Sequence, residues 1–128
     1  MNSNINITED FKKYLAGFFD GDGSIYILKH TKYYRIELNI SQSNEDWIDT
    51  IKKIYPSLIK KTRQARENQK IQYSLVSRGE KMKKLILDIL PYSILKYHQL
   101  EEGLKFLDLV GTKNNDEKDE IYKKIKIL

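Results

Sequence analysis

Residues 34–42 alternate strictly between apolar and polar side chains. The apolar members of this segment are Ile36, Leu38 and Ile40. The polar members between them are Arg35, Glu37, Asn39 and Ser41. Since successive side chains of a strand point to opposite faces of its sheet, this period of two predicts a strand with one buried and one polar face. A chain built around such a strand needs an apolar layer on one side of its sheet, while the other side can stay open to water.

The rest of the chain predicts a second hairpin and several amphipathic helices. The predicted helices cover residues 8–20, 43–55, 77–90, 97–110 and 116–128. The further predicted strands cover residues 24–28, 58–66 and 70–77. Pro56 and Pro91 end two of the helices, because proline cannot continue a helix in its interior. The element order predicts an α+β domain in which helices cover one face of an antiparallel four-stranded sheet.

Length and composition limit the class of protein. The chain has 128 residues, enough for one domain with its own core, and it has no cysteine, so disulfides and thiolate metal sites are excluded. No apolar run approaches the roughly 18 residues of a membrane span, and no secretory signal opens the chain. We therefore expect a soluble intracellular protein without a membrane partner, located in the cytoplasm or in a DNA-containing organelle.

Positive charge is concentrated in one part of the chain. The formal net charge is +5, and residues 51–70 alone contain seven Lys or Arg side chains against one acid, Glu67. A localised basic surface is the electrostatic footprint of a nucleic-acid-binding protein. A solvated basic face without a partner is the other interpretation that charge alone allows.

Two carboxylates, Asp20 and Asp22, stand where the first predicted helix ends. A helix C-terminus carries a partial negative charge, so an acid there costs a few tenths to about 1 kcal/mol. The two carboxylates also repel each other. A segment that violates local rules in this way is where a functional site is expected first.

The acidic pair has three interpretations. The two aspartates can be ordinary turn residues among glycines. An EF-hand calcium loop is excluded, because its sixth position is Ile25 instead of glycine and its twelfth is Thr31 instead of glutamate. The third interpretation is a catalytic Mg²⁺ site, since Mg²⁺ is often held by one or two carboxylates together with substrate phosphates.

The first helix also carries small residues on one face. Gly17 and Gly21 are four residues apart, with Ala16 and Phe19 beside them. Small residues at this spacing let two helices approach closely. A second copy of the chain, related by a two-fold axis, would then bring two acidic pairs side by side.

Residues 15–23, which read LAGFFDGDG, resemble the signature of the LAGLIDADG homing endonucleases, with seven of nine positions matching the family name or a common variant. The resemblance covers residues 8–110 of a single domain spanning residues 1–128, and residues 111–128 form a C-terminal helical extension. It implies the αββαββα fold with a saddle-like sheet. One copy of the motif implies a homodimer with double-stranded DNA as its partner. The residues implied in the dimer interface are Leu15, Ala16, Gly17, Phe19 and Asp20.

The resemblance also implies a set of catalytic residues. Asp22 is the expected metal ligand, and Gly21 is expected to lend a backbone carbonyl to the metal. Asp20 ranks second and is expected mainly to shape the turn that presents Asp22. Gln42 is expected to orient water, and Lys96 to lie near the scissile phosphate. The implied cofactor is Mg²⁺, for which Mn²⁺ or Ca²⁺ could substitute in binding.

Recognition of the DNA sequence is expected to fall to outward-facing side chains of the sheet, since such side chains can enter the major groove. On the first hairpin these are Ser24, Tyr26, Leu28, Arg35, Glu37, Asn39 and Ser41. On the second hairpin they are Arg63, Arg66, Gln72 and Ser74, although the sequence leaves open which face residues 60–66 present. Lysines are expected to contact phosphates, namely Lys52, Lys53 and Lys61.

The expected function is metal-dependent hydrolysis of both strands of a long, near-palindromic DNA site, as in intron homing. The alternative is a non-cleaving LAGLIDADG protein that acts as an intron RNA maturase or a DNA-binding protein. One departure from the family leaves room for this alternative. Related members tend to have an arginine at the start of the helix that follows Gln42, and this chain has Asn44, Glu45 and Asp46 there.

Overall fold

The computed structural model describes residues 7–31, 33–64 and 66–128. The helices are α1 (Glu9–Asp22), α2 (Glu45–Ile54), α3 (Lys83–Ile89), α4 (Tyr97–Leu107) and α5 (Asn115–Ile127). The strands are β1 (Gly23–Lys29), β2 (Tyr34–Gln42), β3 (Ile59–Arg63) and β4 (Gln72–Arg78). Short 3-10 turns, Gly79–Met82 and Leu90–Tyr92, flank α3. This element order confirms the predicted α+β fold.

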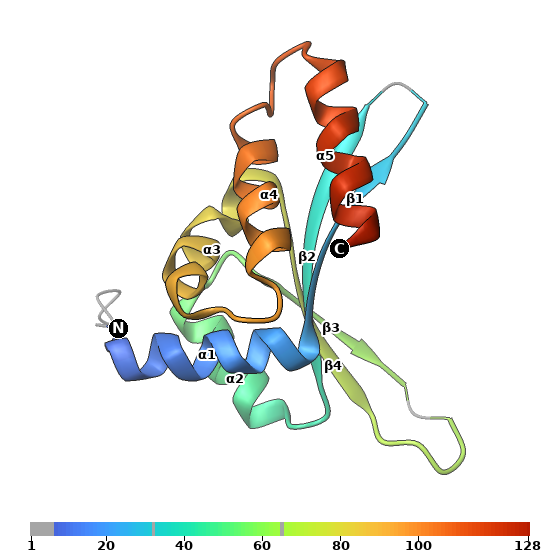
Figure 1. The fold of residues 1–128 in the computed structure, drawn as a ribbon. Helices are drawn as coiled ribbons and strands as arrows, with labels where there is room; N and C mark the ends of the chain where they lie inside the picture. Colours follow the sequence, from blue (N-terminus) through green and yellow to red (C-terminus); the bar gives the residue numbers. More distant parts are fainter. Residues whose placement is uncertain (1–6, 32, 65) are drawn as a thin grey trace.

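The four strands form one antiparallel sheet in the order β1-β2-β4-β3. Figure 1 shows the helices gathered on one side of the sheet. The alternation along β2 has the predicted result, since Ile36, Leu38 and Ile40 lie in the hydrophobic core. The opposite face of the sheet, which we call the open face, carries the residues of alternate parity.

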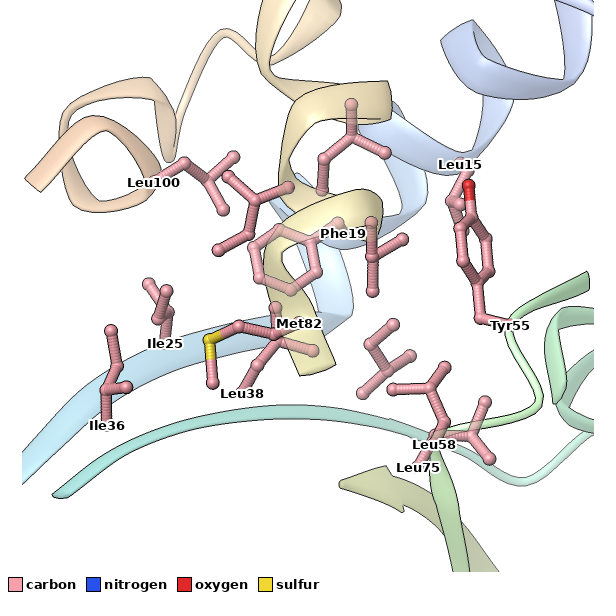
Figure 2. Packing of buried hydrophobic residues seen from close by; sticks show 14 of the residues in the cluster. Leu15, Phe19, Ile25, Ile36, Leu38, Tyr55, Leu58, Leu75, Met82 and Leu100 are labelled. Carbon is pink, nitrogen blue, oxygen red and sulfur yellow. The ribbon is translucent and has the colours of Figure 1, made fainter. Parts of the chain in front are cut away.

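The core lies between the sheet and the helices. Figure 2 shows Phe19 of α1 packed among Ile25, Leu38, Met82 and Leu100, which come from the sheet and from the chain around α3 and α4. Phe19 is fully buried. Burying a side chain of this size contributes roughly 1.5–3 kcal/mol to folding. The first helix is therefore fixed by its own core contacts before any partner is considered.

Several element boundaries differ from the predictions, and α4, for example, ends at Leu107 instead of residue 110. Helix α1 continues to Asp22, two residues beyond the predicted end. Strand β4 continues to Arg78, because Ser77 is a buried strand residue paired with Leu38 and not the start of a helix. Strand β3 ends at Arg63 instead of residue 66. The segment after it turns back through Asn68, whose positive φ of 65° takes the chain out of the extended conformation.

The C-terminal helix α5 shares the core of the rest of the chain. Ile121 and Ile125 belong to the same hydrophobic cluster as the sheet residues. The Tyr34 hydroxyl and the Lys29 ammonium both donate to the Asp119 carboxylate, at 2.7 and 3.0 Å. These bonds attach α5 to the outer end of β1 and β2. None of the helices in the described ranges combines the length and apolar character needed to cross a bilayer.

Candidate active site

The end of α1 meets the end of β2 at one edge of the open face. Asp22 is the last residue of α1, and the next residue, Gly23, pairs with Ile40 two positions before the end of β2. The Gln42 side-chain amide donates to Asp22 Oδ2 at 3.1 Å, and its own oxygen accepts from the Ser43 N–H at 2.8 Å. The fold thus brings together two predicted site residues that lie far apart in the sequence.

Lys96 reaches the same junction from the turn before α4. Its ammonium group donates to the Gly23 carbonyl and lies 5.8 Å from the centre of the Phe19 ring. Gly23 is required at this point, because a Cβ atom there would overlap the Phe19 ring. The absence of a side chain lets the chain turn directly from α1 into β1, and Asp22 and Lys96 flank that turn.

The sequence led us to expect that Asp20 shapes the turn that presents Asp22, but the structure shows a different role. Its carboxylate accepts from the Ser93 hydroxyl and from the backbone N–H groups of Ile94, Leu95 and Lys96, the last three at 2.7, 3.1 and 3.1 Å. Both oxygens are therefore engaged in capping residues 93–96. Asp20 is a positioning residue that attaches the backbone of Lys96 to the end of α1.

These hydrogen bonds also explain why an acid is tolerated at a helix C-terminus. Burial raises the pKa of Asp20, but the bonds from the Ser93 hydroxyl and from three backbone N–H groups outweigh it, so the pKa lies below its ordinary value. The ionised carboxylate is thus stabilised by the folded structure. Four donors offset the unfavourable charge of the helix end.

Replacement of Asp20 should lower stability in a pH-dependent way. Because the folded-state pKa is depressed, ionised Asp20 stabilises the fold fully above the unfolded-state pKa of about 4, and this stabilisation is lost as the pH falls through the lower folded-state value. At pH 7 we expect Asp20→Ala to reduce the free energy of unfolding by about 1–3 kcal/mol, since it leaves several donors without an acceptor. Urea unfolding between pH 2.5 and pH 7 measures this. Asp116→Ala, in exposed α5 surface, is the control. A difference between wild type and Asp20→Ala that does not shrink on acidification would contradict the assignment.

Asp22 is suited to hold a divalent cation. Its side chain is exposed, and its donor Gln42 is a neutral amide that leaves the carboxylate charge in place. Carboxylate and carbonyl oxygens are the ligands that Mg²⁺ prefers, and the last carbonyls of a helix have no partner within it. Within the described residues no three acidic or histidine side chains group closely enough to hold a metal ion. Mg²⁺ would therefore need further oxygens from substrate phosphates or from a second copy of the chain.

The open face carries most of the predicted DNA-reading residues. On β1 and β2, register places Ser24 opposite Asn39 and Leu28 opposite Arg35, all of the parity opposite to the core residues. On β3 and β4, Lys61 pairs with Ser74 and Arg63 with Gln72. This register settles the parity of β3, which the sequence left open. Arg66 lies in the turn beyond β3 and not on the strand.

Several predicted contact residues are engaged within the chain, among them Ser41, whose hydroxyl bonds to the side chains of Asn39 and Ser74. Glu37 lies on the open face but is only 6% exposed, and its carboxylate accepts from Arg78 Nε at 3.1 Å. The prediction of Glu37 as a free reader of bases is therefore wrong. Lys52 donates to the Pro56 and Leu58 carbonyls, at 3.3 and 2.6 Å, which ties its ammonium group to the end of α2 and not to the open face.

The sequence analysis did not predict that Arg78 lies on the open face. Arg78 pairs with Glu37 across β2 and β4, and its side chain is 44% exposed. The alternation that gave Gln72 and Ser74 continues to Val76 and Arg78. Extending that period of two by one residue past the expected end of the strand would have found Arg78.

The predicted dimer interface is only partly available. Leu15, Ala16 and Phe19 are fully buried in the chain's own core, so their side chains cannot contact a second copy. The helical period explains the error, because these residues face the sheet while Gly17 and Gly21 lie on the opposite side of α1. Gly17 and Gly21 are exposed, and a Cβ atom at either position would meet nothing within 4 Å in this chain.

Exposed apolar side chains accompany the outer face of α1. They are Tyr14 at 66%, Ile94 at 84% and Leu95 at 73% exposure. Ile94 and Leu95 lie beside the end of α1, since their N–H groups bond to Asp20. An exposed apolar group of this kind marks an interaction surface.

The first turn of α2 carries two acids, Glu45 and Asp46, and no basic side chain. Asn44 caps the helix by accepting from the Trp47 N–H at 3.1 Å. Glu45 and Asp49 accept from Lys60 at 2.6 and 2.8 Å, and these hydrogen bonds raise the pKa of Lys60 to about 12. Lys60 is therefore held on the helical side of the sheet and supplies no cation to Asp22.

Comparison with known proteins gives one family. A family model described as LAGLIDADG endonuclease matches residues 15–101. No curated protein matches the chain. Among solved structures, the homing endonuclease I-CvuI in complex with its target in the presence of Ca has a TM-score of 0.73 at 23% identity, over 93% of this chain and 82% of that chain.

Two further solved structures share the fold. The archaeal intron-encoded homing endonuclease I-Vdi141I complexed with DNA has a TM-score of 0.76 at 19% identity, over 94% of this chain and 85% of that chain. The LAGLIDADG homing endonuclease I-GzeII in complex with its DNA target has a TM-score of 0.70 at 22% identity, over 96% of this chain but only 44% of that chain. At such identities these similarities establish the fold alone.

Proposed function

The chain belongs to the LAGLIDADG endonuclease family, and from this membership we propose that it is a site-specific DNA endonuclease that cuts both strands of a long, near-palindromic duplex as a homodimer. One observation carries the proposal above all. The exposed Asp22 carboxylate accepts a hydrogen bond from Gln42 at the end of α1, where the chain turns into β1 at the edge of the open face. Lys96 lies on the other side of this turn. Because DNA is the substrate, we also propose an intracellular location.

Each residue of the site has a distinct role in phosphodiester hydrolysis. Asp22 and the Gly21 carbonyl would hold Mg²⁺. When bound, Mg²⁺ would polarise the scissile phosphate as a Lewis acid and lower the pKa of the attacking water. Mn²⁺ or Ca²⁺ could replace it in binding. Gln42 orients water through its amide. The Lys96 ammonium offsets negative charge that develops on the phosphate, and Asp20 keeps Lys96 in place.

A homodimer would complete the site. Two copies related by a two-fold axis through the outer face of α1 would place Gly17 and Gly21 against their equivalents, where a glycine allows close approach. Ile94 and Leu95 would cover the rim of that contact. Two Asp22 carboxylates would then lie near each other, one for each DNA strand. The joint open faces of two sheets would follow the groove on both sides of the cut.

The open face suits duplex DNA. Lys61, Arg63 and Arg66 lie on or beyond β3 and are exposed, so they can meet phosphates or base edges. Ser24 and Asn39 occupy neighbouring strands near the site. A strand rises about 3.3 Å per residue, close to the rise of one base pair, and successive open-face residues are two positions apart, so they would lie about two base pairs apart along the groove.

A plasmid-library cleavage assay tests the proposal. The purified chain is incubated with plasmids that carry randomised or genomic inserts, with Mg²⁺ and with EDTA, and cut ends are sequenced. We expect cleavage at one near-palindromic sequence that requires the divalent cation. Ca²⁺ in place of Mg²⁺ should support binding in a gel-shift assay. Cleavage that persists in EDTA would contradict the metal role, and no cleavage of any duplex would contradict the nuclease.

One observation favours a second candidate, a non-cleaving DNA-binding protein or RNA maturase of the same family. No basic side chain stands at the start of α2, where Asn44, Glu45 and Asp46 follow Gln42. Lys60, the cation beside α2, is bound to Glu45 and Asp49. This candidate predicts Mg²⁺-independent binding to a DNA duplex or to a folded intron RNA with no cut product, which the same assay and a gel shift with RNA would distinguish.

A further inference from the structure

A row of three polar side chains crosses the open face from β1 to β4. Register places Tyr26 opposite Glu37 on the β1–β2 pair and Glu37 opposite Arg78 on the β2–β4 pair. Directly opposed residues of an antiparallel pair lie about 4.5–5.5 Å apart at Cβ, so Tyr26 and Arg78 are each within reach of Glu37. Glu37 is the central member of this row.

The carboxylate of Glu37 is more deeply buried than its position suggests. Its side chain is 8% exposed, while that of Arg78 is 44% exposed. A buried charge is costly unless it is paired and hydrogen-bonded, and Arg78 provides the pair through its Nε at 3.1 Å. Burial and then the charge of Glu37 raise the pKa of Tyr26, which keeps the Tyr26 hydroxyl a neutral donor beside the carboxylate.

The bond to Nε has a geometric consequence. A guanidinium carries five N–H donors in a rigid plane, and the contact to Glu37 uses the one on Nε. The terminal amino groups remain available on the exposed part of the side chain. A bidentate contact to guanine O6 and N7 needs two donors in one plane, held in a fixed direction.

From this arrangement we propose that Arg78 is a specificity-determining residue that reads a guanine in each half of the DNA site, and that Glu37 is a positioning residue that fixes its guanidinium. The inference rests on the proposed function, because it needs duplex DNA on the open face. It replaces the role that the sequence suggested for Glu37 with one for Arg78.

The row also fixes which part of the half-site Arg78 reads. Glu37 is five residues from Gln42 along β2, or roughly 17 Å at about 3.4 Å per residue. At one base pair per 3.4 Å, this places the guanine about five base pairs from the base pairs that lie over Gln42 and Asp22. Arg78 should thus act on recognition and not on the cleavage step.

Selection of bound duplexes from a randomised library, in Ca²⁺ and at fixed salt, tests the inference. The wild-type chain should select a near-palindrome with one invariant guanine per half-site at the stated distance. Arg78→Ala should lose the preference at that position alone and bind the wild-type site about 5- to 150-fold more weakly, the range for one bidentate contact. Glu37→Ala should relax the same position, and Glu37→Gln, which retains an acceptor for Nε, should keep the guanine.

Further variants separate this role from a structural one. Arg78→Ala leaves Glu37 buried without a partner, so the double variant Glu37→Gln/Arg78→Gln, which removes both charges together, is the second test of guanine loss. Lys83→Ala removes a positive charge from the exposed start of α3 on the helical side and should leave every base preference unchanged. Thermal unfolding checks that each variant is folded.

The outcomes distinguish the inference from the function on which it rests. A wild-type chain that selects no duplex sequence contradicts both. A wild-type chain that selects a site, together with a folded Glu37→Gln/Arg78→Gln variant that selects the same guanine, contradicts the inference alone. Retention of the guanine by Glu37→Ala would contradict the positioning role of Glu37.

Discussion

Asp22→Asn is expected to abolish cleavage of the DNA site while leaving DNA binding intact. The substitution replaces a carboxylate by a neutral amide of the same shape, so Gln42 still finds an oxygen at 3.1 Å but the charge that holds Mg²⁺ is lost. Metal-ion stabilisation of a phosphoryl transition state is worth several kcal/mol, which corresponds to a rate loss of at least about 1,000-fold. Single-turnover cleavage of the selected site in Mg²⁺ measures the rate, and a gel shift measures the affinity.

Asp116→Asn is the matched control for this experiment. Asp116 is an exposed acid in the first turn of α5, remote in the fold from the end of α1, and its replacement should change neither rate nor affinity. Cleavage by Asp22→Asn at the wild-type rate would remove Asp22 from the reaction. Loss of DNA binding in a folded Asp22→Asn variant would mean that the residue serves recognition.

Gly17→Glu is expected to give a folded monomer that no longer makes double-strand breaks. A side chain at position 17 meets no atom within 4 Å of its Cβ in the chain itself, and replacing a glycine inside a helix should raise helix stability by about 0.5–1 kcal/mol. In a two-fold contact through α1, the two introduced carboxylates would face each other. Like charges opposed at an interface cost several kcal/mol, so the dimer should weaken by at least about 100-fold.

Sedimentation velocity at micromolar concentration and plasmid cleavage measure the two effects of Gly17→Glu. Ile127→Glu is the control, because Ile127 is 85% exposed on α5, outside the proposed contact, and the substitution introduces the same charge. It should remain a dimer and cleave normally. A Gly17→Glu variant that stays dimeric would place the interface on a surface other than the outer face of α1.

The local pattern of the sequence predicted the architecture well, because side-chain periodicity reports which face of an element is buried. The alternation around Leu38 predicted the strand β2 and which of its two faces is buried. The nine-residue motif predicted the family. Predictions that needed the end of an element were less accurate. The strand containing Ser77 continues to Arg78, since pairing with β2 stabilises two residues that local capping signals assigned to a helix.

Side-chain partners across the fold could not be predicted. Asp20 bonds to the turn at residues 93–96, more than seventy residues away, so no local rule identifies it as an anchor for Lys96. Glu37 likewise follows a polar alternation typical of an exposed reader, and only its pairing with Arg78 shows that it is buried. The same holds for Leu15, which belongs to the motif but faces the core.

The sequence by itself determined the fold class, the family and the residues that could carry chemistry, because periodicity, charge and a short motif are properties of neighbouring residues. The tertiary structure decided which of those residues are free to act. Asp22 is exposed beside Gln42, and Asp20 fixes the position of Lys96 by accepting from its backbone N–H. Glu37 is paired with Arg78 on the open face. The physical reason is that the availability of a carboxylate depends on its donors, and the strands and turns that provide these donors are distant in the chain.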